Sequence, residues 1–330
     1  MYWLLLIPAC LILLLLVALR WAYIKAYGRH RGPENIYARP AKIDPAIASR
    51  VHRLMHELDE VPFEPVEIVS HDGLRLFARY HHVADGAPIH IQCHGYRGSS
   101  LRAFCGANPL ARQKGHNTLM IDQRAHGKSE GKTISFGINE RMDVLCWAEY
   151  LYRRFGSQTP IFLSGVSMGA TTVLMATELP LPKNVVGVIA DCPYSSPRAI
   201  IRKFIGGIGL PVSIGYPLAR TAARLMGGIR GLNTESAVEA VKKSSLPILL
   251  IHGENDNFVP CDMSREIAAT RPESIRLETF AGADHILSYI TDSERYVRIS
   301  NEFIDDCLKN WNSSQSGEKR NKHEKKATCN

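Results

Sequence analysis

The pentapeptide Gly-Val-Ser-Met-Gly at 165–169 places Ser167 directly after a short apolar run at 161–163 and before a helical pattern that begins at Ala170. A sharp turn from strand to helix would lift the serine hydroxyl out of the backbone, which suits a nucleophile. Such a turn crowds the chain, and a glycine on each side relieves the crowding. The start of the following helix also favours negative charge nearby. The pattern predicts a nucleophilic serine, and its simpler alternative is a tight turn with an incidental serine.

A serine hydroxyl needs a base beside it, and the base needs an orienting acid. Asp256 follows the predicted strand 248–251, and His285 follows the last predicted strand, 275–280. Ligands bind at the carboxyl ends of the strands in open α/β sheets. We therefore predict that Ser167, Asp256 and His285 meet at that edge, in the chain order serine, acid, histidine. Taken singly, the histidine could be a solvated loop residue and the aspartate a turn or helix-capping residue. The rival acids are Asp191, which is next after Asp256, and the neighbours Glu254 and Asp284.

Acyl transfer also requires two preorganised N–H donors for the oxyanion. The amide of Met168, just after the serine, is the first candidate. The second comes from the loop after the predicted strand 89–93, where the small Gly95 lets the backbone approach a substrate carbonyl. Tyr96 N–H is then the donor, and His94 is expected to brace the loop.

These residues need a sheet to position them. Alternating runs at 66–70 and 74–82 around an Asp-Gly turn predict a hairpin. From Pro88 onward, short apolar runs alternate with helical patterns, which indicates βαβ units. The expected strands of this part are 89–93, 118–121, 161–163, 185–190, 248–251 and 275–280. We predict an α/β fold for residues 62–311, a mostly parallel mixed sheet covered by helices on both faces.

The segment 193–245 interrupts this alternation. It contains several prolines and glycines and two apolar-basic helical stretches, 198–205 and 216–226. A connection of this length inside a compact domain is expected to have structure and a purpose. We predict an inserted helical cap over the site.

Five motifs together resemble the α/β-hydrolase superfamily: His94-Gly95, the segment 122–131, the serine elbow, the segment 252–256 and Asp284-His285. The resemblance covers about 66–308 and extends to the branch that contains serine aminopeptidases, monoacylglycerol lipases and lysophospholipases. It implies an α/β-hydrolase fold with a triad of Ser167, Asp256 and His285 and with Tyr96 and Met168 as oxyanion donors. It also implies a structural charge pair of Asp122 with Arg124 beside the elbow. The motifs do not separate peptidases from esterases.

The first twenty residues differ from the rest in composition. Residues 2–19 carry no charge and are mostly Leu, Ile, Val and Ala, close to the ~20 residues that span a bilayer as a helix. Aromatic residues flank the run, as interfacial anchors do. No basic residue precedes it and no small-residue cleavage site follows, so a transmembrane anchor at 1–20 is favoured over a signal peptide or a buried helix. Basic residues after the run place the catalytic domain in the cytoplasm by the positive-inside tendency, and eight scattered cysteines agree with reduced thiols.

The remaining segments are predicted as a linker with a short helix at 21–61 and a disordered basic tail at 312–330, where apolar residues are scarce. The net charge of +8 is spread along the chain without a nucleic-acid-binding signature, so no nucleic acid is expected. Histidines 81, 82, 90 and 94 lack a convincing ligand set, so we predict no metal. No motif indicates a cofactor, and the oligomeric state is not specified.

The sequence thus predicts a single-pass membrane serine hydrolase that cleaves carboxylic esters through an acyl-enzyme. The apolar and basic cap favours lipid esters as the narrower choice of small-molecule substrate. One alternative is a serine peptidase of the aminopeptidase-like branch. Another is a non-catalytic protein that binds ligands on this fold, although a complete triad with both oxyanion loops argues against it.

Overall fold

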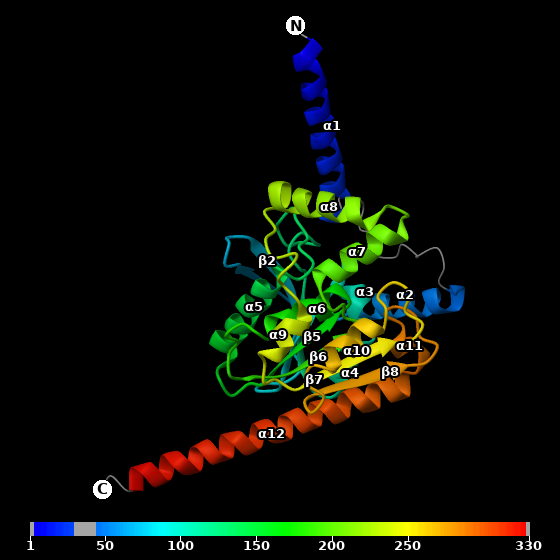
Figure 1. The fold of residues 1–330 in the computed structure, drawn as a ribbon. Helices are drawn as coiled ribbons and strands as arrows, with labels where there is room; N and C mark the ends of the chain where they lie inside the picture. The colour runs from blue at the N-terminus through cyan, green and yellow to red at the C-terminus, as the bar shows by residue number, and fades with distance from the viewer. Residues whose placement is uncertain (1–2, 30–43, 328–330) are drawn as a thin grey trace.

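A single eight-stranded sheet forms the centre of the protein (Figure 1). The computed structural model describes residues 3–29 and 44–327. The strand order is β1-β2-β4-β3-β5-β6-β7-β8. Strand β2 pairs antiparallel with both β1 and β4, and all other neighbouring strands pair in parallel. The mostly parallel mixed sheet is confirmed. The strands are β1 Glu64–Val69, β2 Arg75–His81, β3 Ile89–Cys93, β4 Asn117–Ile121, β5 Ile161–Val166, β6 Val185–Asp191, β7 Ile248–Gly253 and β8 Ile275–Phe280.

Helices cover both faces of the sheet, because alternate residues of a strand point to opposite faces. On β5, Leu163 belongs to a large apolar cluster with Trp147 of α5 and Val173 of α6. Its neighbour Phe162 belongs to a second cluster with Phe303 of α12. The helices around the sheet are α2 Pro45–Asp59, α3 Ser100–Phe104, α4 Ala107–Gln113, α5 Glu140–Phe155, α6 Met168–Ala176, α9 Ala237–Lys242, α10 Asp262–Ala268, α11 Ser288–Thr291 and α12 Ser293–Ala327.

The segment 193–245, predicted as a cap, contains three helices of two kinds. Helices α7 (Pro197–Gly207) and α8 (Val212–Gly227) lie above the body of the domain, with α8 outermost (Figure 1). Helix α9 instead packs against α6 and α10, because its apolar side chains join the main core cluster. The part that stands over the domain is therefore the pair α7 and α8.

Helix α1 (Trp3–Ala26) projects from the domain, and its base meets α8 (Figure 1). The stretch Ile7–Ala26 is long and apolar enough to cross a membrane. Large side chains from Ile7 to Val17 are exposed, whereas Leu19, Tyr23 and Tyr27 are buried against the domain. The helix continues past residue 20, where the predicted anchor ended, because this second part has a protein surface to pack on.

The C-terminal end differs from the predicted disordered tail. Helix α12 packs through Tyr296, Ile299, Phe303 and Cys307, which share one face, and its backbone stays helical to Ala327. Residues 312–314 are already exposed, so the extension is not held by burial. The sequence there is rich in Lys, Glu and Arg, which are good helix formers, and a helix that is already nucleated elongates readily. Within the predicted linker, residues 30–43 lie outside the described residues, and α2 covers the expected short helix.

Candidate active site

Ser167 occupies the turn between β5 and α6, with φ of 55° and ψ of −116°. A positive φ is strained for a residue with a Cβ, so the surrounding backbone must hold it. The Ser167 amide donates to the carbonyl oxygen of Asp191 at 2.8 Å. A Cβ at Gly165 would collide with the backbone of Gly169, and a Cβ at Gly169 would collide with the carbonyl group of Cys93. The two glycines of the elbow are thus required by close approach of neighbouring backbone.

The structure brings together the three residues predicted to act as a unit, from the turn after β5 and the loops after β7 and β8. Ser167 Oγ lies 3.0 Å from His285 Nε2, and His285 Nδ1 lies 2.6 Å from Asp256 Oδ2. With its proton on Nδ1, the imidazole presents a lone pair at Nε2 to the serine hydroxyl. This is the arrangement of a nucleophile, its base and an acid that orients the base.

Asp256 is buried but well supplied with donors. The amides of Phe258 and Val259 donate to its Oδ1 at 2.9 and 2.7 Å, and His252 Nε2 lies 3.3 Å from its Oδ2. Burial alone would raise the pKa of Asp256, but the hydrogen bonds from His252 and His285 outweigh burial and hold the pKa well below its usual range. The carboxylate therefore stays ionised and can stabilise a positive imidazole.

The rival acids have other partners. Asp191 ends β6, and its Oδ2 accepts from Tyr296 Oη at 3.2 Å. Glu254 accepts from the hydroxyl of Thr279 at 2.7 Å, and Asp284 accepts from the backbone amide of His285 at 2.7 Å. The ring of His285 is therefore paired with Asp256, in agreement with our first choice among these acids.

The loop after β3 lies against the nucleophile. A Cβ at Gly95 would come within 3.3 Å of Ser167 Cβ, so the absence of a side chain lets this loop approach. The amide of Gln123 donates to His94 Nε2 at 3.1 Å, and the Gln123 side chain donates to the His94 carbonyl oxygen, so His94 braces the loop as expected. Tyr96 follows Gly95 in this loop, and Met168 is the first residue of α6. Both predicted oxyanion donors thus belong to segments that adjoin Ser167.

The last turn of α1 holds the same loop. Tyr96 Oη donates to the carbonyl oxygen of Ala26 at 2.9 Å, and the guanidinium of Arg97 donates to that of Lys25 at 2.9 Å. Carbonyl groups at a helix C-terminus lack partners within the helix, and the helix dipole favours a cation there. The loop after β3 is therefore fixed both by Gln123 and by the end of the apolar N-terminal helix.

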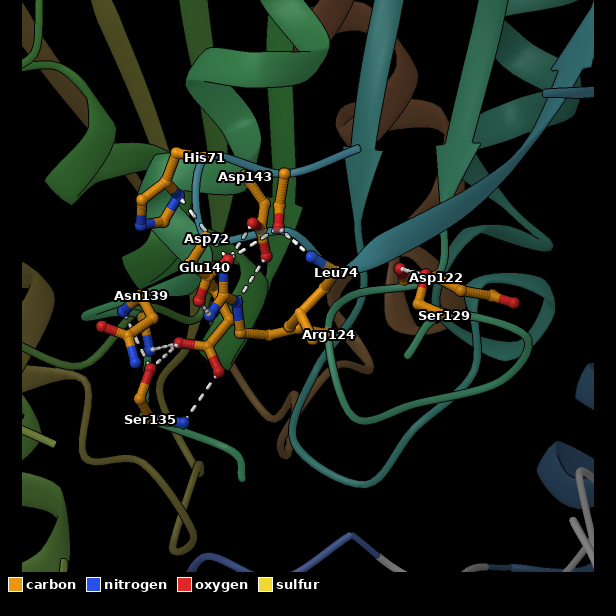
Figure 2. A network of polar contacts seen from close by, with 12 residues as sticks. His71, Asp72, Leu74, Asp122, Arg124, Ser129, Ser135, Asn139, Glu140 and Asp143 are labelled. Carbon is orange, nitrogen blue, oxygen red and sulfur yellow. Dashed lines mark hydrogen bonds and ion pairs between the residues drawn. The ribbon is translucent and has the colours of Figure 1, made fainter. Parts of the chain in front are cut away.

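A network of ion pairs surrounds Arg124 (Figure 2). The expected pair with Asp122 was wrong: Arg124 Nε lies 2.7 Å from Asp143 Oδ2, and its Nη1 lies 2.9 Å from Asp72 Oδ2. Asp122 instead accepts from the amide of Lys128 at 2.9 Å. Burial alone would lower the pKa of Arg124, but the two carboxylates outweigh burial and raise it. The partners come from α5 and the β1–β2 turn, which proximity in the sequence does not reveal.

Two groups beside the triad were not predicted. His252 reaches Asp256 with one ring nitrogen, while its Nδ1 lies 2.7 Å from Ser264 Oγ. The ring centroid of Phe258 lies 4.9 Å from that of His285 and 4.8 Å from that of Phe204 on α7. The only sequence feature that could have pointed to His252 and Phe258 is their position within a few residues of Asp256, the predicted acid.

Two groups of side chains have spacings that a metal ion could use. One is Cys192 with Asp256 and His285, and the other is His71 with Asp72 and Asp143. In the first group Asp256 and His285 already bond to each other, and His285 also bonds to Ser167. In the second, both aspartates bond to Arg124. The polar atoms of these groups thus have a role in the protein itself.

Comparison with known proteins gives the class. Residues 91–210 match a family model described as alpha/beta hydrolase fold. Among curated proteins, the chain is 27% identical over 216 residues to the uncharacterized protein YqkD of Bacillus subtilis, covering 65% of this chain and 70% of that one. It is 27% identical over 196 residues to human protein ABHD12B, covering 56% of this chain and 49% of that one.

Solved structures agree. Esterase Pf2001 of Pyrococcus furiosus superposes with a TM-score of 0.60 at 21% identity, covering 76% of this chain and 93% of the esterase. Est1E of Butyrivibrio proteoclasticus, solved with ferulic acid bound, gives a TM-score of 0.58 at 23% identity, covering 74% and 99% of the two chains. This chain has the α/β-hydrolase fold, and its sequence is similar to proteins of that class.

Proposed function

We propose that this protein is a membrane-anchored serine hydrolase that cleaves carboxylic esters. The observation that carries the proposal is the hydrogen-bonded series from Ser167 through His285 to Asp256. A hydroxyl, an imidazole and a buried ionised carboxylate in this order are the parts needed for acyl transfer. The likeness to two esterase structures supports an ester substrate.

In the proposed reaction, His285 Nε2 takes the hydroxyl proton as Ser167 Oγ attacks the ester carbonyl. The amides of Tyr96 and Met168 donate to the oxyanion, and the leaving alcohol takes its proton from His285. The resulting acyl-enzyme is hydrolysed by a water molecule that the same imidazole activates. Asp256 keeps the imidazole in the required tautomer and stabilises its positive form.

Apolar side chains beside the triad support an apolar acyl or alcohol group. Phe258 and Ile286 are exposed: the Phe258 ring packs near that of His285, and Ile286 follows His285 in the sequence. Phe204 extends this surface onto α7. Such a wall places hydrophobic contact next to the reacting bond. We therefore favour lipid esters as the narrower substrate class.

The geometry of α1 supports an uncleaved anchor. Helix α1 runs unbroken from the apolar stretch to the carbonyl groups that bond to Tyr96 and Arg97 in the loop after β3, so removal of the stretch would leave those carbonyl groups on a shortened helix. Arg20 and Lys25 follow the exposed apolar stretch, so the positive-inside tendency places the catalytic domain in the cytoplasm.

Replacement of Ser167 by Ala tests the catalytic assignment. We expect the full chain in detergent to hydrolyse p-nitrophenyl esters and to react with a fluorophosphonate probe, and Ser167→Ala to lose both. Ser164→Ala is the matched control, because Ser164 is a buried serine on β5, the strand that leads into Ser167. Hydrolysis that survives in Ser167→Ala at the wild-type rate would refute the assignment.

A series of p-nitrophenyl esters of increasing acyl length, run beside amino-acid amides, tests the substrate class. The apolar wall predicts that kcat/KM rises with chain length until the acyl group covers Phe258. Phe258→Ala should flatten that dependence while labelling of Ser167 persists. A preference for amides over every ester would favour the peptidase alternative and overturn the esterase proposal.

A further inference from the structure

The cap carries unusually exposed apolar side chains. Ile208, Ile214 and Leu225 are 71%, 64% and 68% exposed. In the described part of the chain outside α1, only four large apolar side chains are more than 60% exposed, and these are three of them. Ile214 and Leu225 stand eleven residues apart on α8, so at 100° per residue they project within about 20° of each other. They form one exposed strip along the outer side of the helix.

The same segment is strongly basic. Between Asp191 and Glu235 the sequence contains no acidic residue and six basic ones: Arg198, Arg202, Lys203, Arg220, Arg224 and Arg230. Arg220 and Arg224 are exposed on α8 and project about 120° and about 80° around the helix from Ile214. Apolar and cationic side chains together on the outer face of a helix are typical of helices that lie in a membrane interface.

The base of α1 fixes the level at which α8 lies. The exposed apolar part of α1 ends at Val17, and the exposed residues Arg20 and Trp21 follow, which is where a bilayer boundary is expected. The buried Tyr23 meets α8 close to Gly227. Figure 1 shows α8 lying across the base of α1 rather than along it. Helix α8 is thus at the depth of the lipid headgroups if α1 spans the membrane.

We propose that the outer face of α8, with Ile208 at the α7–α8 corner, is a second membrane-contact surface that rests on an anionic phospholipid bilayer. The proposal depends on the anchoring of α1 in the proposed function and goes beyond it, because it fixes the orientation of the domain. The bilayer is the occupant because the surface is continuous with the apolar exposed part of α1 and has no acidic side chain. Insertion of the apolar strip and attraction of the arginines to anionic headgroups would act together.

This orientation connects the bilayer to the catalytic site. Helix α7 carries Phe204, which contacts Phe258 next to His285. Lys203 of the same helix donates to the carbonyl oxygen of Asn257, beside the triad acid, at 2.5 Å. The cap segment that carries the proposed bilayer surface therefore also contacts the loop that holds Asp256.

Photocrosslinking in nanodiscs tests the proposal on the full chain. Benzoyl-phenylalanine is placed singly at Ile214, Leu225, Leu13 and Val83, and phospholipid adducts are measured by mass spectrometry after irradiation. Leu13 reports on the anchoring of α1. Val83 is the control, because it is exposed but precedes β3, at the sheet edge opposite the carboxyl ends. Fluorophosphonate labelling of Ser167 verifies that each variant is folded.

We expect adducts at Leu13, Ile214 and Leu225, several-fold above the yield at Val83. Adducts at Leu13 with only control-level yield at Ile214 and Leu225 would overturn the cap surface and leave the anchor intact. Control-level yield at Leu13 as well would overturn the anchoring, and the cap surface with it.

Lipid charge provides a second readout. The yield at Ile214 should be higher in nanodiscs that contain phosphatidylglycerol than in pure phosphatidylcholine. Arg220→Gln and Arg224→Gln should lower this preference, by up to about fivefold for each charge, and Arg153→Gln on α5 should not. Equal yields in both lipids for the wild type would refute the role of the arginines.

Discussion

Asp191 and Asp256 follow neighbouring strands, β6 and β7, and both side chains are buried at the same edge of the sheet, yet their electrostatics are opposite. Burial raises the pKa of Asp191 to about 6. Burial also raises the pKa of Asp256, but His252 and His285 bring it well below the usual range. Below about pH 6 the two carboxyl groups at adjacent strand ends therefore have different protonation states, Asp191 mostly protonated and Asp256 ionised.

The difference lies in the donors that each loop supplies. Oδ1 of Asp256 accepts two backbone amides and its Oδ2 faces two histidine rings. Oδ2 of Asp191 accepts from Tyr296, while its Oδ1 is buried without a hydrogen-bond partner among the described residues. Burial raises the pKa of both carboxyl groups, and the number and charge of the donors around Asp256 are what reverse that effect.

The largest effect is expected when the oriented acid loses its charge. Asp256→Asn keeps the size of the side chain but no longer stabilises the imidazolium or the required tautomer of His285. We expect kcat for ester hydrolysis to fall by about 10⁴-fold. Asp191→Asn is the matched control and should leave kcat close to wild type, since Asp191 does not contact His285 by a hydrogen bond. Equal losses in the two variants would remove the distinction between the acids.

The second effect is on stability and concerns Asp191. Because its pKa rises from 3.8 to about 6 on folding, the native state holds this proton more tightly than the unfolded chain. The wild type therefore loses stability as pH rises from about 4 to about 6, and the loss is constant above that. Asp191→Asn does not titrate, so relative to wild type it should be more stable at pH 8 than at pH 4, by up to about 3 kcal/mol.

Denaturant unfolding of both proteins in detergent at the two pH values measures this quantity. Groups that titrate in both proteins cancel in the comparison, so the pH-dependent part belongs to Asp191. A difference between wild type and Asp191→Asn that is the same at pH 4 and pH 8 would contradict a raised pKa at this site.

The sequence was sufficient to predict the turn at Ser167 and the meeting of Ser167, Asp256 and His285, because each prediction depends on local rules. The glycines around Ser167 are demanded by crowding at a strand–helix turn, and strand-end positions of Asp256 and His285 follow from apolar runs. The preference for Asp256 over Asp191 came from loop position and agrees with the observed pairing. What local rules could not give was the set of donors that makes Asp256 the better acid.

Contacts between distant segments were beyond the sequence for the same reason. Arg124 pairs with Asp72 and Asp143 instead of its neighbour Asp122, because folding places those two carboxylates around the guanidinium. The carbonyl groups at the end of α1 meet Tyr96 and Arg97 across some seventy residues of sequence. No periodicity or motif in the sequence indicates that the side chains of this loop will bond to the C-terminal end of α1.

A smaller loss of activity is expected when one hydrogen-bond donor of Asp256 is weakened. His252→Gln retains a side chain that can donate a hydrogen bond, but it does not restore both the contact to Asp256 and the contact to Ser264. We expect kcat to fall about tenfold, the value of one hydrogen bond to a charged group, with KM little changed. The loss should be far smaller than in Asp256→Asn, because His285 and two backbone amides still donate to the Asp256 carboxylate. A fall as large as that of Asp256→Asn would mean that His252 does more than supply one donor.

The smallest effect is expected from loss of the tyrosine hydroxyl that donates to Asp191. Tyr296→Phe removes the hydroxyl 3.2 Å from Asp191 Oδ2, in a ring that otherwise packs in the core. That bond favours the charged carboxylate, so its loss raises the pKa of Asp191 further. We expect a destabilisation of about 1.5 kcal/mol at pH 8, where Asp191 is ionised, and less at pH 5, where it is mostly protonated.

Tyr289→Phe, on the ring that packs against Tyr296, is the control for removal of a hydroxyl. In the Asp191→Asn background the cost of Tyr296→Phe should no longer depend on pH, and a persistent pH dependence there would assign it to a different acid.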